Sequence, residues 1–280
     1  MAGPAHAVNV KVDVIVKDFY YFCIPKNRAM DSSAIFSQQF DIQSHTIDAN
    51  QNVNLQYLLG CMQTTADLHV DSRGIGWKEL NEKGGFWAIY RMGLQIERLP
   101  RKYDHITIRT WANPPQNLLQ PRSFEVVGDD GTRFLRAQSL WIVMSTADFR
   151  PLKVEEVIGS DVPYLIGADS SFEMNLKVPR IALPEETSSL LPQRVKYSDI
   201  DVNHHVNNTT YVRWFIDSYD FNFLQCHHLK ELIINYTKQI KADDEYATFL
   251  QKKSESEHLF SIVNASDGSE YCKMKAEWSR

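Results

Sequence analysis

The sequence predicts an α+β fold made of two similar halves, each with a helix on one face of an antiparallel sheet. Two observations support this prediction. Both halves end in the same hairpin pattern, an Asp-Gly turn between two alternating strands, and both place one amphipathic helix ahead of their strands. The chain has 280 residues, a length that suits two modest domains.

The C-terminal hairpins of the two halves match in spacing. Residues 124–144 read FEVVGDDGTRFLRAQSLWIVM, and residues 260–280 read FSIVNASDGSEYCKMKAEWSR. Asp-Gly favours such a turn because glycine readily adopts the positive φ that the turn needs. Gly131 and Gly268 are 137 positions apart (268 − 131), and so are Trp141 and Trp278 (278 − 141). The equal spacing indicates an internal repeat.

A helix and a pair of alternating segments precede each hairpin. The paired segments span 93–111 in the first half and 232–250 in the second. Apolar residues at i, i+3 and i+4 predict helices over 53–70 and over about 208–224. The faces expected to be buried are Leu58, Cys61, Met62, Thr65 and His69 in the first helix, and Tyr211, Phe215 and Tyr219, flanked by Trp214, in the second.

A polar, turn-rich stretch from Pro151 to about Pro192 separates the halves. It is predicted to be an interdomain linker, with a long surface loop as the alternative. We place the two domains at 31–155 and 193–280, with the linker proper at 156–192. Residues 1–30 stand outside the repeat and are predicted to be a peripheral or poorly ordered extension, although NVKVDVIV within them could form an edge strand.

Composition favours an ordinary soluble globular protein, with 43% hydrophobic residues, 23% charged residues and a net charge of −5. The lack of a basic stripe argues against nucleic-acid binding. No apolar run approaches the roughly 18 residues of a membrane span, and the acids near the start argue against a secretory signal. Cys23, Cys61, Cys226 and Cys272 form no C-x-x-C motif and have apolar or aromatic neighbours. Reduced thiols and a cytoplasmic location are therefore expected.

Polar residues crowd the start of the second predicted helix, where residues 197–217 read YSDIDVNHHVNNTTYVRWFID. Free N–H groups at a helix start can hold an oxyanion, and a carboxylate and an imidazole beside them can position or deprotonate water. This set suits hydrolysis of an activated ester or thioester. A plain helix cap is one alternative. A metal site is another, but adjacent histidines point apart and no cysteine or H-E-x-x-H partner accompanies them.

The segment D-I-D-V-N-H-H-V-N-N-x-x-Y-V-x-W at 199–214 closely resembles the signature of the acyl-acyl carrier protein thioesterases. The likeness extends to NLQYLLGCMQTTADLHVDSRGIG at 54–76, WAIYRM at 87–92 and RAQSLWIVM at 136–144, and it runs from about Phe36 to the C-terminus. The resemblance implies a tandem (double) hotdog fold, in which two antiparallel sheets each wrap a central helix. It also implies release of a free fatty acid from acyl carrier protein, which ends fatty acid synthesis, with no metal or organic cofactor.

The resemblance implies catalytic roles for residues of the second half. Asp201, Asn203 and His205 match the family residues that bind and polarise the thioester and the attacking water. His204 stands where a neutral residue is more usual, so His205 is preferred of the pair. Gln239 stands where many members carry a glutamate. Because an amide cannot act as a general base, Gln239 is expected to orient water while Asp201 or His205 accepts the proton.

The resemblance further implies that the first half holds the acyl chain. Met62, Thr65 and Trp87 are candidate tunnel walls, with ordinary core packing as the alternative, and Asn207 and Asn208 are candidate substrate contacts. Acyl carrier protein is acidic, so a basic rim is expected to attract it. The candidates for that rim are Arg101, Lys102, Arg122, Arg133, Lys238 and Lys241.

Other functions stay open because Gln239 replaces the glutamate. One is a thioesterase that acts on acyl-CoA, and another is a non-catalytic acyl-binding protein on the same fold. A dehydratase is a weaker alternative, since that chemistry acts on a 3-hydroxyacyl group. A homodimer is possible, although the double repeat already supplies the unit that single-repeat hotdog proteins form by pairing.

Overall fold

The computed structural model describes residues 35–159, 174–182 and 191–280. They belong to one compact unit, Ser33–Arg280. The extension and edge strand expected within residues 1–30 therefore lie outside the described residues.

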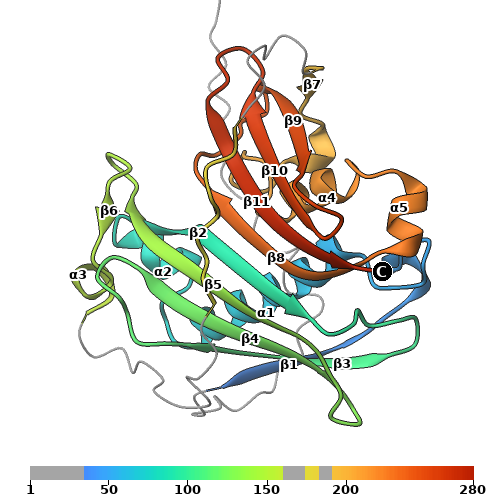
Figure 1. The fold of residues 1–280 in the computed structure, drawn as a ribbon. Helices are drawn as coiled ribbons and strands as arrows, with labels where there is room; N and C mark the ends of the chain where they lie inside the picture. Colours follow the sequence, from blue (N-terminus) through green and yellow to red (C-terminus); the bar gives the residue numbers. More distant parts are fainter. Residues whose placement is uncertain (1–34, 160–173, 183–190) are drawn as a thin grey trace, which may run out of the picture. The chain divides into compact units, whose positions relative to one another are not determined.

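Antiparallel pairing joins the described strands into one 11-stranded sheet, in the order β1-β3-β4-β5-β2-β8-β11-β10-β9-β7, with β6 paired to β5 (Figure 1). The first half supplies β1 (Phe36–Asp41), β2 (Gly85–Ile96), β3 (His105–Ala112), β4 (Gln120–Gly128), β5 (Arg133–Ser145) and β6 (Pro151–Leu152). The second half supplies β7 (Gln193–Arg194), β8 (His228–Tyr236), β9 (Glu245–Lys252), β10 (Glu257–Asn264) and β11 (Glu270–Ser279).

The two halves meet where β2 pairs with β8, from Arg91 opposite Asn235 to Gln95 opposite Glu231. The predicted α+β fold is confirmed, but the two sheets expected from the sequence are halves of one continuous sheet. The predicted hairpins are also confirmed. Gly131 and Gly268 occupy the β4–β5 and β10–β11 turns with φ of 79° and 70°, values that glycine adopts without strain.

The helix of the first half, α1 (Leu55–Ser72), begins at Asn54, whose side chain accepts hydrogen bonds from the N–H groups of Gln56 and Tyr57. Every residue predicted for its inward face is buried. Two shorter helices accompany this half, α2 (Trp77–Glu82) and α3 (Val154–Ile158), together with the 3₁₀ turn η1 (Ser44–Thr46).

The second predicted helix is divided in two. Helix α4 (Asn208–Ile216) ends before Ser218, whose hydroxyl donates to the carbonyl of Trp214. Helix α5 (Phe221–Cys226) then begins under the cap of Asp220. The 3₁₀ turn η3 (Tyr197–Asp199) precedes α4. The prediction of one helix over 208–224 was therefore wrong, because side chains that bond to the backbone end the helix early.

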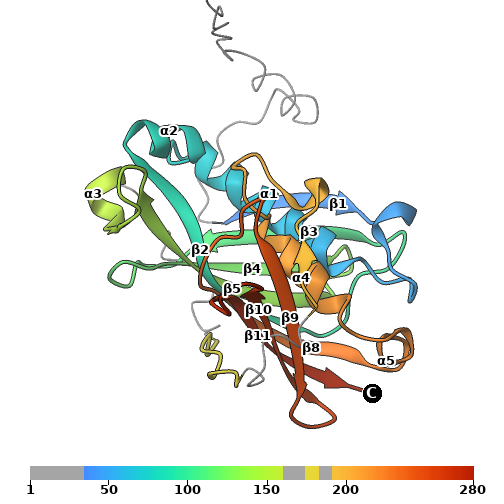
Figure 2. The ribbon, with the colours of Figure 1, turned by 90° about the horizontal axis from the view of Figure 1, so that it is seen from above.

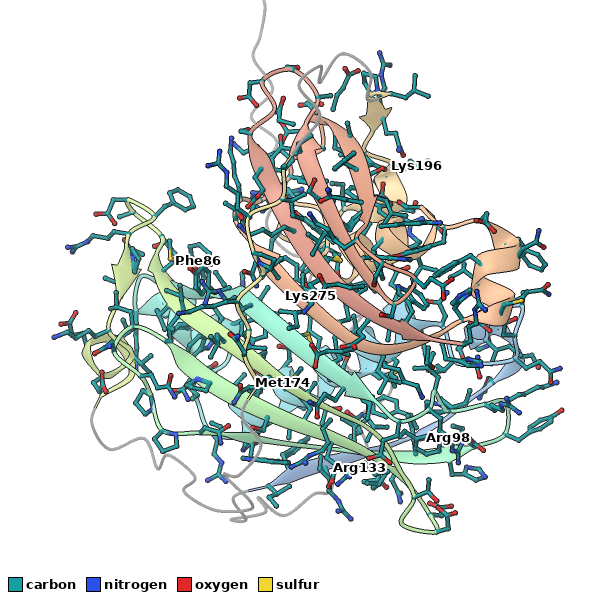
Figure 3. The ribbon with its side chains drawn as sticks, viewed as in Figure 1. Phe86, Arg98, Arg133, Met174, Lys196 and Lys275 are labelled. Carbon is teal, nitrogen blue, oxygen red and sulfur yellow. The ribbon has the colours of Figure 1, made fainter. Side chains whose placement is uncertain are left out.

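Helices α1 and α4 contact each other on one face of the sheet, and the described part of the linker, residues 174–182, lies on the opposite face (Figures 1 and 2). The side chain of Asn235 in β8 holds this segment: it accepts from the Val178 N–H at 3.2 Å and donates to the Leu176 carbonyl at 2.8 Å. Met174 lies in front of the sheet, over Gly93 (Figure 3). A Cβ at Gly93 would come within 2.4 Å of Leu176.

The main core cluster combines the inner faces of α1 and α4 with both halves of the sheet. A small second cluster, formed by Leu80, Val143 and Val154, lies under α2 and α3. Cys61 and Cys272 are buried and free, as expected, whereas Cys226 is exposed, and Cys23 lies outside the described residues. In the part of the chain that the structure describes, no helix is long and apolar enough to span a bilayer.

Candidate active site

The polar loop ahead of α4 is closed on itself by backbone hydrogen bonds. The N–H of Asp201 donates to the His205 carbonyl at 2.9 Å, and the N–H of His204 donates to the Asp201 carbonyl at 3.0 Å. Ile200 and Val206 form an isolated β-bridge across the base of the loop. His204 takes the left-handed conformation, with φ of 62°, at the turn. We call residues 199–207 the active-site loop.

Asp199 anchors the active-site loop to α4. This carboxylate is buried, with 1% of the residue exposed, and forms an ion pair with Arg213 of α4. It also accepts from the N–H of Lys196 at 2.8 Å, and the Asp199 carbonyl accepts from the N–H of Asn207 at 2.8 Å. Asp199 was not among the predicted site residues, although an arginine on the next helix was a signal for such a pair.

The structure places the three predicted catalytic residues in this one loop. Asp201 is half-buried, and its carboxylate accepts from the N–H of Asn203 at 2.8 Å, whereas Asn203 itself is exposed. His205 is half-buried, and its Nδ1 is buried without a hydrogen-bond partner among the described residues. That nitrogen is therefore a potential acceptor or donor that the described residues leave unused.

Gln239 lies beside the loop, in the segment between β8 and β9. The next residue, Ile240, accepts a hydrogen bond from the N–H of Val206 at 2.9 Å, and Lys241 forms a β-bridge with His205. Gln239 is exposed. The pairing of 240–241 with 205–206 thus brings the predicted position next to the loop.

Asn207 is the N-cap of α4, which was the alternative interpretation of the polar run. Its Oδ1 accepts from the N–H of Thr209 at 2.9 Å and from the Thr209 hydroxyl at 2.7 Å. This acceptor is occupied by the cap, and the substrate contact expected of Asn207 stays a prediction.

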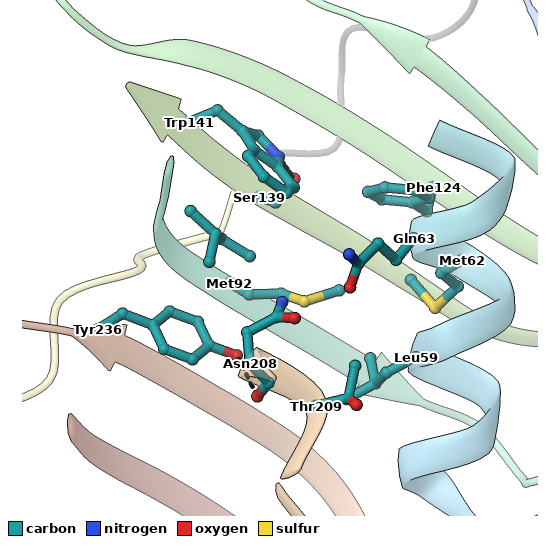
Figure 4. A pocket seen from close by; sticks show the side chains of 11 residues that line it. Leu59, Met62, Gln63, Met92, Phe124, Ser139, Trp141, Asn208, Thr209 and Tyr236 are labelled. Carbon is teal, nitrogen blue, oxygen red and sulfur yellow. Dashed lines mark hydrogen bonds between the residues drawn. The ribbon is translucent and has the colours of Figure 1, made fainter. Parts of the chain in front are cut away.

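A small cavity of about 20 Å³, room for about one water molecule, lies between α1, the sheet and the first turn of α4 (Figure 4). Its lining is Leu59, Met62 and Gln63 from α1, Ile89 and Met92 from β2, Phe124 from β4, Ser139 and Trp141 from β5, Asn208 and Thr209 from α4, and Tyr236 from β8. The walls from the first half are mostly apolar, and the end formed by the second half is polar. The cavity therefore links an apolar compartment to the helix start that follows the active-site loop.

Tyr236 forms part of the polar end of the cavity. Its hydroxyl donates to the Asn208 carbonyl at 3.4 Å. Burial raises the pKa of this phenol well above its ordinary value, so it stays a neutral donor.

The structure places two of the remaining predicted substrate contacts, Met62 and Asn208, in the cavity wall and two elsewhere. Thr65 lies one turn further along α1, where its hydroxyl donates to the Cys61 carbonyl at 2.8 Å. The indole of Trp87 donates to the Ile75 carbonyl at 3.3 Å and packs on the small second cluster. Thr65 and Trp87 thus do not line this cavity, and their roles as tunnel walls stay predictions.

Arg122 does not belong to a basic rim, because only 7% of it is exposed. Its guanidinium donates to His69 Nδ1 and to the Thr110 hydroxyl, both at 3.1 Å. Burial lowers its pKa to about 10, so it remains charged at neutral pH. Burial, together with this cation, lowers the pKa of His69 to about 3. In the described ranges, no group of three or more His, Cys, Asp or Glu side chains is arranged to hold a metal ion.

The repeated helix-on-sheet halves, joined at β2–β8 over an apolar cavity, define a double-hotdog protein. The chain belongs to the acyl-ACP thioesterase family: residues 33–161 match the acyl-ACP thioesterase N-terminal domain, and residues 183–280 match the C-terminal domain.

Similar proteins include the chloroplastic palmitoyl-acyl carrier protein thioesterase of Gossypium hirsutum, which is 26% identical over 272 residues, covering 90% of this chain and 65% of that protein. The chain thus spans slightly less than two thirds of the length of this relative. An acyl-ACP thioesterase structure from Bacteroides thetaiotaomicron is similar with a TM-score of 0.78 and 25% identity, covering 88% of this chain and 98% of that one. The 12:0-ACP thioesterase of Umbellularia californica has the same fold, with a TM-score of 0.78 and 20% identity over 88% of this chain and 98% of that one.

Proposed function

We propose that this chain hydrolyses the thioester of fatty acyl-acyl carrier protein and releases a free fatty acid. One observation carries the proposal: the mostly apolar cavity ends at the first turn of α4, directly after the active-site loop. An acyl chain that enters between the apolar walls, which must move apart to admit it, has its carbonyl group near this helix start. The positive end of the helix dipole favours negative charge there.

In the proposed reaction, water attacks the carbonyl carbon, a C–O bond forms, and the C–S bond breaks. His205 is the proposed base, because its Nδ1 has no partner among the described residues, whereas the Asp201 carboxylate already bonds to Asn203. The proton from water passes to His205 and then to the leaving thiolate, so His205 returns to its starting protonation state. Asn203 and Gln239 hold water and the thioester by hydrogen bonds.

The proposed partner is acyl carrier protein. The chain belongs to the acyl-ACP thioesterase family, and the relative from Gossypium hirsutum is named a palmitoyl-acyl carrier protein thioesterase. Lys238 and Lys241 are exposed on either side of Gln239 and could meet an acidic carrier. A cytoplasmic location is also proposed, from the buried free thiols of Cys61 and Cys272. The plant relatives, by contrast, are named chloroplastic.

The direct test is fatty acid release from a panel of acyl-acyl carrier proteins with short to long chains. Asp201→Ala and His205→Ala are each expected to lower kcat by about 10²-fold or more. The matched controls are Asp243→Ala and His228→Ala, which remove exposed side chains of the same types and should leave kcat unchanged. Turnover that survives both active-site substitutions would disprove the assignment.

Gln239 motivates a second candidate, a non-catalytic acyl-binding protein. Measurable acyl binding without turnover in the natural chain, followed by a large gain in Gln239→Glu, would favour it. Parallel assays with one acyl chain on acyl carrier protein and on coenzyme A separate the two thioesterase activities. Faster release from the protein carrier supports the main proposal, and faster release from coenzyme A contradicts it.

A further inference from the structure

Gln63 is a polar side chain from the first half that reaches into the cavity. It extends from α1 toward Met92 and Asn208 (Figure 4). Its Oε1 is buried and has no hydrogen-bond partner among the residues that the structure describes. A buried acceptor without a partner loses its hydration and gains nothing in exchange, so such an atom calls for a functional explanation.

Two of the polar residues that line the cavity with Gln63, Tyr236 and Thr209, already have partners of their own. The Tyr236 hydroxyl donates to the Asn208 carbonyl, and the Thr209 N–H and hydroxyl donate to Asn207. None of these donors is directed to Gln63. The amide oxygen of Gln63 is therefore a hydrogen-bond acceptor at the polar end of the cavity, and none of these groups donates to it.

Helix α1 holds this acceptor in a fixed position relative to α4. Gln56 donates from Nε2 to the Thr210 hydroxyl at 3.4 Å and so ties the first turn of α1 to the start of α4. Gln63 follows Gln56 by two helical turns and shares its side of the helix. The first half thereby places the Gln63 amide beside the first turn of α4 in the second half.

We propose that Gln63 is a further catalytic residue: its amide oxygen accepts a hydrogen bond from the water that attacks the thioester. An acceptor needs a ligand with an O–H or N–H group, and the thioester has neither, whereas water has two O–H groups. Gln63 holds one O–H of the water while the other proton passes to His205. The amide gains and loses no proton, so it orients the nucleophile without acting as a base. This assignment rests on the proposed function.

The test compares Gln63→Met, which keeps the length of the side chain and removes both polar atoms, with the natural chain. A misplaced nucleophile can cost about 10²-fold in rate, so kcat is expected to fall by about that factor with less than about a three-fold change in KM. The melting temperature should stay the same or rise, because the substitution removes an unpartnered buried polar atom. Lost activity with retained or increased stability is a combination that a merely structural glutamine does not give.

The matched control is Gln95→Met on β2, where the amide is exposed and outside the cavity lining. It should leave both the melting temperature and kcat nearly unchanged. A Gln63→Met variant with unchanged kcat overturns the role of Gln63 while the natural enzyme still turns over. A variant that loses stability and raises KM also overturns it, because both results indicate packing. No turnover in the natural chain overturns the proposed function and this role together.

Discussion

The ion pair between Asp199 and Arg213 offers a quantitative test of how the active-site loop is held. Asp199 has a side chain that is 1% exposed, and the Arg213 side chain is 31% exposed. The substitution Arg213→Met keeps most of the aliphatic stem on α4 and removes the guanidinium. It leaves the Asp199 carboxylate buried, with the Lys196 N–H as its remaining donor among those described above.

Removing one partner of a fully buried pair costs about 3–5 kcal/mol, because the other charge stays behind without compensation. Arg213 is partly exposed, so water can solvate the vacated site and the expected loss falls to about 2–3 kcal/mol. For a chain of this size, each kcal/mol shifts the melting temperature by about 2–4 °C. Arg213→Met is therefore expected to melt about 4–12 °C below the natural chain.

Urea titration followed by tryptophan fluorescence measures the free energy of unfolding for this variant. The double variant Asp199→Asn/Arg213→Met should regain most of the loss, because the amide oxygen still accepts from Lys196 and carries no charge. The exposed pair Arg194–Glu245 supplies the control: Arg194→Met should cost less than about 1 kcal/mol. A double variant that loses the sum of both single losses would refute the reasoning.

Three further outcomes follow from the structure. Gly93→Ala should cost about 1–3 kcal/mol in a urea titration, because the new Cβ would meet Leu176 on the linker; an unchanged midpoint would show that the linker moves away freely. Asn207→Ala should cost about 0.5–2 kcal/mol through loss of the α4 cap, and Asn207→Asp should restore most of it. The folded-state pKa of His69 is about 3 against an ordinary value of 6.5, so its stabilising effect is complete above pH 6.5 and is lost as pH falls toward 3. His69→Gln should therefore flatten the fall in stability between pH 6.5 and pH 4, and an unchanged slope would contradict the pKa shift.

The elements that the sequence predicted well are those with local signals. The Asp-Gly hairpins formed as expected because two residues and the alternation on either side determine them. The pairing of β2 with β8 had no such signal, since no turn joins these strands and their contact depends on the whole fold. The helix over 208–224 was predicted too long because Tyr219 continues the apolar spacing beyond the residue at which α4 ends.

The site shows the same division between local and long-range information. Asp201, Asn203 and His205 all lie within residues 201–205. One loop therefore contains them all, and a sequence motif can identify them as candidates. Gln63 was missed because the helical pattern identifies apolar neighbours such as Met62 and says nothing about which distant polar group an adjacent glutamine will face. Arg122 was misplaced for a different reason: it shares the alternation of the buried Phe124 and Val126, and that pattern already indicated an inward side chain.

The pairing of β2 with β8 has a consequence for how this protein behaves in dilute solution. The two strands belong to one chain, so their pairing is unimolecular and does not weaken as the protein concentration falls. In an assembly of two identical chains, every substitution appears twice, once on each side of the symmetry axis. Here a substitution changes only one half, so a wall of the cavity can be altered without the same alteration appearing beside the active-site loop.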